Sequence, residues 1–241
     1  PSGLRLNSSM LLLILNGSIT RWDDTAIQDL NPSLNLPDER IVVVHSGDDN
    51  NDSSSSLMLL NQYLDLQSLS WPKNNSIATS GPAELAEMVR KIPYSVGYVD
   101  FSYAVQTRMT YAAIEDADGN YIVPSMQSIG QAVDSALQFE KSSTDPSSSS
   151  LSQQSPPTIN ASRIVNGSYP IVGLYYASLL ANDDEQEEGG RRSIAILDFV
   201  EWIISESGGQ QTLLEVQYPP IYSSNEELAT YAMTKMDTVE R

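Results

Sequence analysis

A run of β-branched residues, Ile41-Val-Val-Val44, constrains the fold of this chain more than any other feature. Polar residues bound the run, and its apolar side chains follow one another without alternation. A strand with two apolar faces is buried on both sides, as the strands of parallel sheets are. Helices must then cover both faces of the sheet, so the run predicts an α/β fold built in layers.

Helices are predicted both before and after this strand in the sequence. Leu11 to Leu15 form a short apolar helix, which Gly17 can end by adopting a positive φ. Asp23 and Asp24 are placed to cap a second helix, which stops at Asn31-Pro32. Beyond the strand, apolar residues repeat at helical spacing from a start near Ser54 to Ser56, at positions Leu57, Leu60, Tyr63 and Leu64.

The rest of the chain continues the alternation of helices and strands. The sequence predicts helices over 84–91, 128–139, 193–205 and 223–236, strands over 96–99 and 169–175, and a hairpin turn at 118–120. Tyr103, Tyr111 and Ile122 are expected in strands or short turns. Two segments rich in polar residues, 142–157 and 182–190, are expected to be loops.

Charge and composition exclude several classes of function. The net charge is −18 at pH 7, so the chain repels nucleic acid and anionic lipid, and neither is expected as a partner. Any anion site must therefore depend on local N–H groups. The chain has no cysteine, which excludes disulfides and thiolate metal sites. Its longest apolar run, Met10 to Leu15, is too short to cross a bilayer, and Pro1 suggests a processed or excised segment.

Acceptor sequences for N-glycosylation are numerous. Six Asn-x-Ser sequons make their asparagines candidate glycosylation sites: Asn7, Asn16, Asn51, Asn74, Asn160 and Asn166. The alternative is that they arise incidentally in loops rich in Ser and Asn. Their number favours an extracellular or cell-surface protein made through the secretory pathway.

Four motifs stand in one order along the chain. They are Gly17-Ser-Ile-Thr-Arg-Trp-Asp-Asp-Thr-Ala-Ile27, Ile92-Pro-Tyr-Ser-Val-Gly-Tyr-Val-Asp-Phe-Ser-Tyr-Ala104, Tyr169-Pro-Ile171 and Tyr218-Pro-Pro-Ile221. Together they resemble the phosphate-binding proteins of bacterial ABC importers, a family of two-lobed solute-binding proteins. Phe199, Trp202 and Gly209-Gln210 resemble the family's C-terminal helix.

The resemblance implies a fold and a division of the chain. The expected fold class is α/β, with periplasmic-binding-protein-like lobes of type II, a mixed sheet flanked by helices and an incomplete first lobe. Residues 1–165 would form a domain like the second lobe, and 166–241 the C-terminal part of the first. The family places part of its first lobe before this region. A closed clamp would need that missing first-lobe segment, or a membrane-tethered partner region.

The family's ligand loop is altered in this chain. The family reads Val-Val-His-Arg-Ser-Asp-Gly-Ser-Gly-Thr-Thr, and here the corresponding run extends from Val43 to Ser56 with about four extra residues. Ser54, Ser55 and Ser56 stand where the family has Ser-Gly-Thr, and Ser46 replaces the arginine. The resemblance implies that these four serines are candidate phosphate-binding residues.

The chemistry of these residues supports binding without a strong charge. The N-terminus of a helix leaves N–H groups unpaired and carries a partial positive charge, so Ser54 to Ser56 can cradle an oxyanion. The alternative is that one of these serines caps the helix and the others face water. Losing the arginine removes a contact worth about 1.5–3 kcal/mol. Asp48, Asp49 and Asp52 add repelling carboxylates, so weakened phosphate binding is expected.

Other readings of the same loop have less support. Asp48-x-Asn50-x-Asp52 has the spacing that opens an EF-hand, but the later glycine is absent and Leu59 stands where the bidentate glutamate belongs. A solvated acidic loop is favoured over a calcium site, and no metal ligands are assigned. His45, the chain's one histidine, is expected to play a structural part at the end of the strand.

No set of catalytic residues or nucleotide-binding loop stands out, so neither an enzyme nor a cofactor is expected. The leading hypothesis is a non-catalytic extracellular module that binds inorganic phosphate or a similar oxyanion. The alternative is a degenerate binding-protein scaffold that serves receptor assembly or adhesion with no small ligand. The tryptophans Trp22, Trp71 and Trp202 are expected to anchor the core or an interface between lobes.

Overall fold

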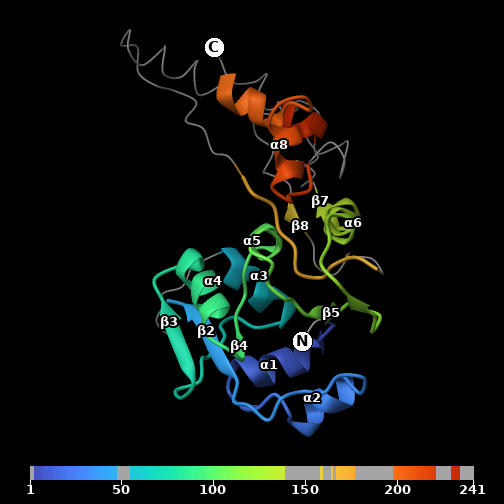
Figure 1. Cartoon of the computed structure of the whole chain (residues 1–241). Coiled ribbons are helices and arrows are strands. Elements are labelled where there is room, and N and C mark those ends of the chain that lie inside the picture. Colours follow the sequence, from blue (N-terminus) through green and yellow to red (C-terminus); the bar gives the residue numbers. More distant parts are fainter. Residues whose placement is uncertain are drawn as a thin grey trace.

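The computed structural model describes residues 3–47, 55–138, 158–159, 164, 167–176, 198–220 and 229–233. Figure 1 shows a larger body that holds the first strands and helices, with α6, β7, β8 and α8 beyond one end of it. The elements are β1 (Arg5–Leu6), α1 (Ser8–Leu15), α2 (Thr25–Leu30), β2 (Val42–Ser46), α3 (Ser55–Tyr63), β3 (Ser76–Thr79), α4 (Pro82–Lys91), β4 (Ser95–Val96), α5 (Phe101–Gln106), β5 (Ala113–Glu115), β6 (Tyr121–Ile122), α6 (Met126–Ala136), β7 (Leu137–Gln138), β8 (Thr158–Ile159) and α8 (Gly209–Glu215).

The β-branched run forms the central strand of a parallel sheet with the order β3-β2-β4. Val44 of β2 pairs with Ile77 of β3, and Val43 pairs with Val96 of β4. Val43 and Val44 are buried, as expected for a strand covered on both faces. The prediction of a buried parallel strand is therefore confirmed, and the fold is α/β.

A second sheet, with the order β1-β5-β6, is mixed. Strand β1 runs parallel to β5, and β5 runs antiparallel to β6 through the predicted hairpin. Gly119 has a φ of +86° in this turn, a conformation that glycine adopts without a steric cost. A two-stranded antiparallel pair, β7-β8, joins Leu137 to Ile159.

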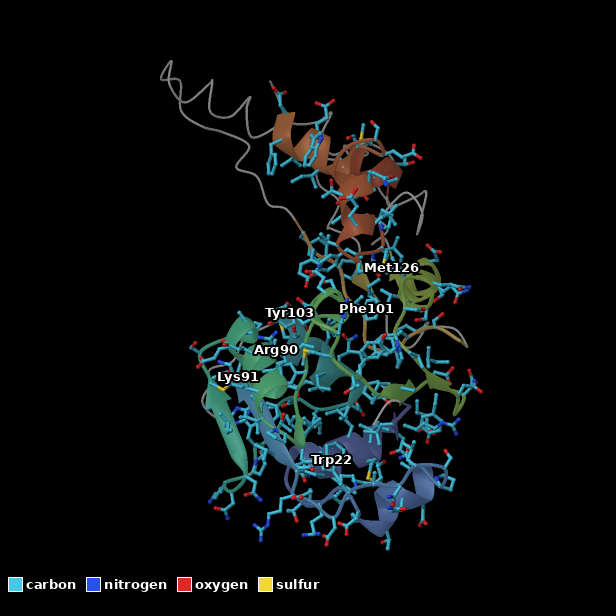
Figure 2. The ribbon with its side chains drawn as sticks, viewed as in Figure 1. Trp22, Arg90, Lys91, Phe101, Tyr103 and Met126 are labelled. Carbon is cyan, nitrogen blue, oxygen red and sulfur yellow. The ribbon has the colours of Figure 1, made fainter. Side chains whose placement is uncertain are left out.

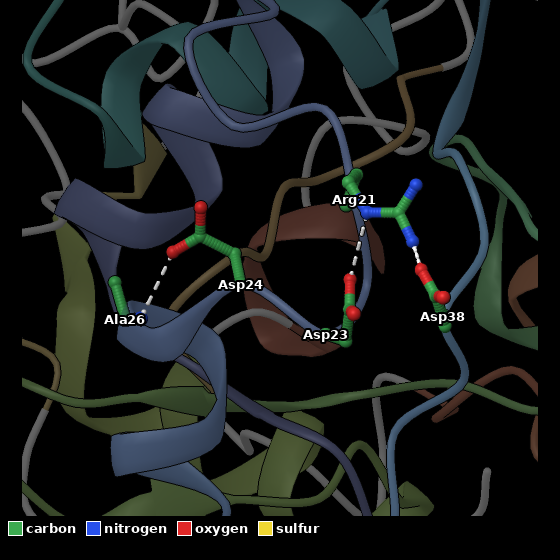
Figure 3. Close-up of polar contacts among 5 residues, drawn as sticks. All are labelled: Arg21, Asp23, Asp24, Ala26 and Asp38. Carbon is green, nitrogen blue, oxygen red and sulfur yellow. Dashed lines mark hydrogen bonds and ion pairs between the residues drawn. The ribbon is translucent and has the colours of Figure 1, made fainter.

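Polar side chains set the ends of the first helices. Asp24 caps α2, and its Oδ1 accepts the Ala26 N–H at 2.9 Å (Figure 3). The neighbouring Arg21 donates from Nε to Asp23 Oδ1 at 3.0 Å and also forms an ion pair with Asp38. The predicted cap of this helix is therefore confirmed. Its side chain satisfies an N–H group that the helix leaves unpaired.

The core lies between α1, α2, α3 and the strands of the larger body. Ile14, Ile27 and Val44 are fully buried. Trp22 is buried in the same cluster and donates from Nε1 to the Tyr94 carbonyl at 2.9 Å. Figure 2 shows Trp22 at the end of the larger body that is farther from Met126. Trp71 is buried as well. Trp202 is 49% exposed, so it is not a core residue, and its role at an interface between lobes stays a prediction.

Two predictions are wrong, and the strand predicted over 96–99 is present only as β4 (Ser95–Val96). Residues 169–175 form no strand, because Pro170 has no N–H for a ladder; the Tyr169 N–H instead donates to the Ser128 carbonyl at 3.0 Å. Tyr103 lies in α5 and not in a strand or turn. The helix begins after Asp100, whose carbonyl accepts the Ala104 N–H, and Figure 2 shows it between the larger body and α6.

The C-terminal part of the chain departs from expectation in one more place. Residues 198–204 are helical, as predicted, but a further helix, α8, follows Gly208. A Cβ on Gly209 would lie 2.5 Å from the Ile203 Cα, so only glycine allows the two helices to meet so closely. The predicted loops at 142–157 and 182–190 lie outside the described residues. The division at 165/166 stays a prediction.

Candidate functional site

Ser46 ends β2 at the carboxyl edge of the parallel sheet. Ligands of open α/β sheets bind at this edge, because the strands end there and the following helices begin there. The serine is 2% exposed, and it lies between Thr79 of β3, its register partner, and the segment that follows β4. The sequence therefore folds so that the residue in place of the family's arginine is held inside the protein.

The hydroxyl of Tyr98 holds Ser46 in place. The Ser46 N–H donates to the Tyr98 Oη at 3.2 Å, and the Ser46 Oγ lies 3.2 Å from the same oxygen. Tyr98 follows β4 by two residues, so this contact spans 52 positions of the chain. One phenol therefore fixes both the backbone and the side chain of Ser46.

A stack of three rings stands beside this contact. The rings of His45 and Trp71 lie 4.5 Å apart at an angle of 7°, and those of Trp71 and Tyr98 lie 6.0 Å apart at 14°. His45 is buried, and its Nδ1 lies 3.1 Å from the carbonyl oxygen of Gly47. A carbonyl can only accept, so Nδ1 carries a proton and donates. The structural part expected for His45 agrees with this packing.

Thr79 joins the ends of β2 and β3. Its Oγ1 donates to the His45 carbonyl at 3.1 Å, and its own carbonyl accepts the Gly47 N–H at 2.9 Å. Because both bonds lie at the last residues of the strands, they hold the edge of the sheet on which Ser46 stands.

Gly97 brings Tyr98 close to β2. A Cβ at this glycine would lie 2.6 Å from Val89 Cγ2 and 3.0 Å from both Leu85 Cδ2 and the Val44 carbonyl oxygen. Real Cβ atoms essentially never come within 3.0 Å of a neighbour, so a side chain at this position would force the chain away from α4 and β2. The absence of a side chain is what allows the next residue to reach Ser46.

Two of the other candidate serines begin α3. Ser55 is exposed and Ser56 half-buried, and Leu57 and Leu60 anchor the helix in the core. The first turn of α3 holds no acidic residue, so its N–H groups keep their partial positive charge. Ser54 lies outside the described residues, as do Asp48, Asp49 and Asp52. The structure thus places Ser46, Ser55 and Ser56 at the strand end and helix start that the candidate loop joins.

Comparison with known proteins identifies the family. A family model described as "PBP superfamily domain" matches residues 1–207. The chain belongs to this superfamily.

Among curated relatives, this PBP-superfamily chain resembles proteins named "Phosphate-binding protein PstS". The protein of Methanocaldococcus jannaschii is 28% identical over 217 residues, which are 84% of this chain and 54% of the relative. That of Xylella fastidiosa strain Temecula1 is 29% identical over 231 residues, 92% of this chain and 57% of the relative. The chain therefore spans little more than half the length of these relatives, and it is PstS-like over most of its own length.

One solved structure has low sequence identity to this chain. It is titled as a putative phosphate ABC transporter substrate-binding protein with bound phosphate from Clostridium perfringens. Its identity to this PBP-superfamily chain is 17% and its TM-score is 0.49. The matched region covers 90% of this chain and 63% of the solved one.

The sequence alone does not indicate two residues that contact Ser46 or its strand end in this PBP-superfamily chain. The sequence predicts only that Tyr98 lies in a strand over 96–99, and nothing around Thr79 indicates a role. The pair Gly97-Tyr98 was the available signal, because a glycine next to an aromatic residue at a strand end often marks a close approach of the backbone.

The sequons of the PBP-superfamily chain differ in their surroundings. Asn7 caps α1, and its Oδ1 accepts the Met10 N–H at 2.8 Å. Asn16 accepts the Ser18 N–H at 2.9 Å, whereas Asn74 is exposed. Asn51, Asn160 and Asn166 lie outside the described residues. Within the described part of the chain, no helix is long and apolar enough to cross a membrane, and no three His, Cys, Asp or Glu side chains gather as metal ligands would.

Proposed function

We propose that this PBP-superfamily chain is a non-catalytic module that binds inorganic phosphate or a similar oxyanion in an extracellular or cell-surface protein. One observation carries the proposal: Ser46 is buried at the carboxyl end of the central parallel strand, and the helix that follows in the chain begins with Ser55 and Ser56. The relatives in which this region recurs are named for phosphate binding.

The ligand would be held by neutral groups. The first N–H groups of α3 have no partner within the helix, and the hydroxyls of Ser54, Ser55 and Ser56 add donors beside them. Ser46 supplies a hydroxyl where the family has a guanidinium. Because a charged hydrogen bond contributes about 1.5–3 kcal/mol, the affinity would be about tenfold to hundredfold below that of a site with the arginine.

The module would close on its ligand with a further segment. The resemblance divides the chain into a lobe at 1–165 and part of another at 166–241, and the relatives are nearly twice as long as the aligned region. A first-lobe segment, or a membrane-tethered partner region, would supply the remaining contacts. The oxyanion site of this chain is then one half of a clamp.

A second candidate function is a binding-protein scaffold that serves receptor assembly or adhesion without a small ligand. The contact between Ser46 and Tyr98 favours it, because the N–H and hydroxyl of the serine both face a protein group. In that case the serines of α3 would serve as an N-cap and as solvated side chains.

Isothermal titration of phosphate separates the two functions, with sulfate as the competing oxyanion. We would titrate the 241-residue chain and the longest natural chain that contains it. The double variant Ser55→Ala/Ser56→Ala should weaken phosphate binding about tenfold. Ser135→Ala is the matched control, since this serine lies in α6 and bonds the Ala132 carbonyl; its affinity should equal that of the wild type.

A gain-of-function variant provides the converse test. Ser46→Arg, combined with deletion of four residues from the loop, restores the family's pattern and should raise phosphate affinity at least tenfold. The absence of phosphate binding in both wild-type chains, together with no gain in this variant, would refute the proposed function and leave the scaffold.

A further inference from the structure

The hydroxyl of Tyr98 makes two contacts with one residue of the candidate site. It accepts the Ser46 N–H and lies within hydrogen-bond distance of the Ser46 Oγ, both at 3.2 Å. A side chain that holds only the backbone leaves the hydroxyl rotor of a serine to turn. Contact with both atoms restricts the positions that the Ser46 side chain can adopt.

The ring that carries this hydroxyl is itself held on several sides. It stacks at 14° on Trp71, which stacks in turn on His45. Strand β4 pairs with β2 at Val43 and Val96, two residues before Tyr98. Gly97 allows the backbone to approach Val44 and α4. The Tyr98 ring is thus packed against residues of the core.

The chemistry of the pair differs from that of the residue it replaces. A guanidinium only donates hydrogen bonds and always carries a charge, whereas each hydroxyl both donates and accepts. Two hydroxyls at the strand end therefore offer an oxyanion a neutral contact in place of a charged one. Preorganisation of the Ser46 side chain raises affinity because the ligand does not pay to order it.

We propose that Tyr98 is a positioning residue of the oxyanion site, which acts by holding Ser46 at the end of β2. The inference rests on the proposed function of that site. It adds a residue that follows the neighbouring strand β4 to the four serines, and it assigns to the stack of His45, Trp71 and Tyr98 the role of holding the contact in place.

The variant Tyr98→Phe tests this directly, because it removes the hydroxyl and keeps the stacked ring. Its dissociation constant for inorganic phosphate, from isothermal titration, should rise about tenfold. Tyr63→Phe is the matched control: its hydroxyl donates to the Glu115 carbonyl at 2.9 Å, near the other end of α3. That variant should lose thermal stability while its phosphate affinity stays within twofold of wild type.

A double-mutant cycle shows whether Tyr98 acts through Ser46. In the Ser46→Ala background, Tyr98→Phe should change the dissociation constant by less than threefold, because the side chain that it holds is gone. A purely structural tyrosine would give the same tenfold loss in both backgrounds, and that result would overturn the inference.

A measurement on the wild-type protein does not depend on how the variants fold. The ring signals of Tyr98 in NMR spectra should shift on saturation with phosphate, and those of Tyr63 should not. An unchanged Tyr98 signal refutes the role of Tyr98 but not the proposed function. The same conclusion follows if Tyr98→Phe binds phosphate as tightly as wild type while Ser55→Ala/Ser56→Ala binds it more weakly. Failure of the wild-type chain to bind phosphate in any form refutes the proposed function as well.

Discussion

The side-chain amide of Asn31 pairs with the backbone of Arg5 as a neighbouring strand would. Its Oδ1 accepts the Arg5 N–H at 2.8 Å, and its Nδ2 donates to the Arg5 carbonyl at 3.0 Å. The same Nδ2 donates to the Ile27 carbonyl at 2.9 Å, at the end of α2. Asn31 is 2% exposed, so it joins the free edge of β1 to a helix end within the core.

Removing this amide should be costly. Asn31→Ala leaves the N–H and carbonyl of Arg5 without their partner, and each buried unpaired group costs about 1–3 kcal/mol. We expect the free energy of unfolding in urea to fall by about 3 kcal/mol. Asn16→Ala is the control, because its single bond to the Ser18 N–H is exposed; it should cost under about 1 kcal/mol. Equal losses in the two variants would contradict this account.

Glycine is required at position 17 for two separate reasons. Its φ is +77°, and a Cβ there would lie 2.6 Å from Pro72 Cβ. Gly119 has a similar φ of +86° but open space around the missing side chain. Gly119→Ala should therefore cost about 1 kcal/mol from backbone strain alone, and Gly17→Ala at least about 1 kcal/mol more. Thermal unfolding of the two variants measures the difference between their losses of stability. Equal losses would show that the contact with Pro72 does not contribute.

Asp116 should make the protein sensitive to acid. Burial by itself would raise the pKa of this carboxyl, but N–H groups of Asn120, Gly167 and Asp118 donate to it and lower the pKa below its ordinary value. A depressed pKa in the folded state stabilises the protein above about pH 4, the pKa of the unfolded state, and this contribution is lost as pH falls further.

The variant Asp116→Asn tests this dependence. It should reduce stability at pH 7 by about 2 kcal/mol, since an amide cannot accept at both atoms, and should flatten the loss of stability between about pH 4 and pH 2. Asp118→Asn removes the same charge from an exposed position of the turn and is the matched control. An unaltered acid limb in Asp116→Asn would argue against the assignment.

Tyr169 should make the stability of the protein depend on pH in the alkaline range. Burial raises the pKa of its phenol to about 12. In the unfolded chain a tyrosine ionises near pH 10, so between about pH 10 and 12 the folded state holds a proton that the unfolded state has lost. Stability is complete below about pH 10 and falls above it. Tyr169→Phe should retain more of its neutral-pH stability at pH 11 than wild type does; a parallel decline of both proteins in guanidinium titrations would contradict this.

The sequons can be ranked by their surroundings. Asn74 is exposed, whereas the side chain of Asn7 caps a helix. On expression through a eukaryotic secretory pathway, Asn74→Gln should remove one glycan and increase electrophoretic mobility, and Asn7→Gln should leave the mobility unchanged. Digestion with a glycosidase that removes N-linked glycans provides the check. The reverse pattern would mean that the cap of α1 opens during synthesis.

Elements with a local signal could be predicted from the sequence. The run Ile41-Val-Val-Val44 is apolar on both faces, Asp24 stands immediately before its helix, and Asp118-Gly-Asn120 has the residues of a tight turn. In each case the physical cause acts within a few residues. The start of α3 at Ser55 and the end of α1 before Gly17 belong to the same class.

Contacts between distant parts of the chain could not be predicted in this way. Tyr98 meets Ser46 across 52 positions, and Asn31 meets Arg5 across 26. The local sequence around Tyr98 or Asn31 does not indicate the partner of either residue, because each contact depends on how the strands pair. The helix α8 was missed for a related reason: Gly208-Gly209 stops a helix by local rules, but the close packing of Gly209 on Ile203 begins another.

The serines of the candidate site could be predicted, but their surroundings could not. The resemblance to a family located Ser46, Ser55 and Ser56, which the structure places at one strand end and one helix start. It said nothing of what surrounds them, since the aromatic stack beside Ser46 is drawn from three segments. The burial of Ser46 is likewise a property of the folded sheet and not of the loop's composition.

The close packing around Gly97 couples positions 97 and 98. Any Cβ there collides with Val89, Leu85 and the backbone of Val44, and the displacement would carry the phenol of Tyr98 away from Ser46. In a selection from a randomised library, clones altered at position 97 should be lost with those altered at 98, although glycine has no atom that could touch a ligand. The absence of a side chain at position 97 thereby limits which mutations this end of the sheet tolerates.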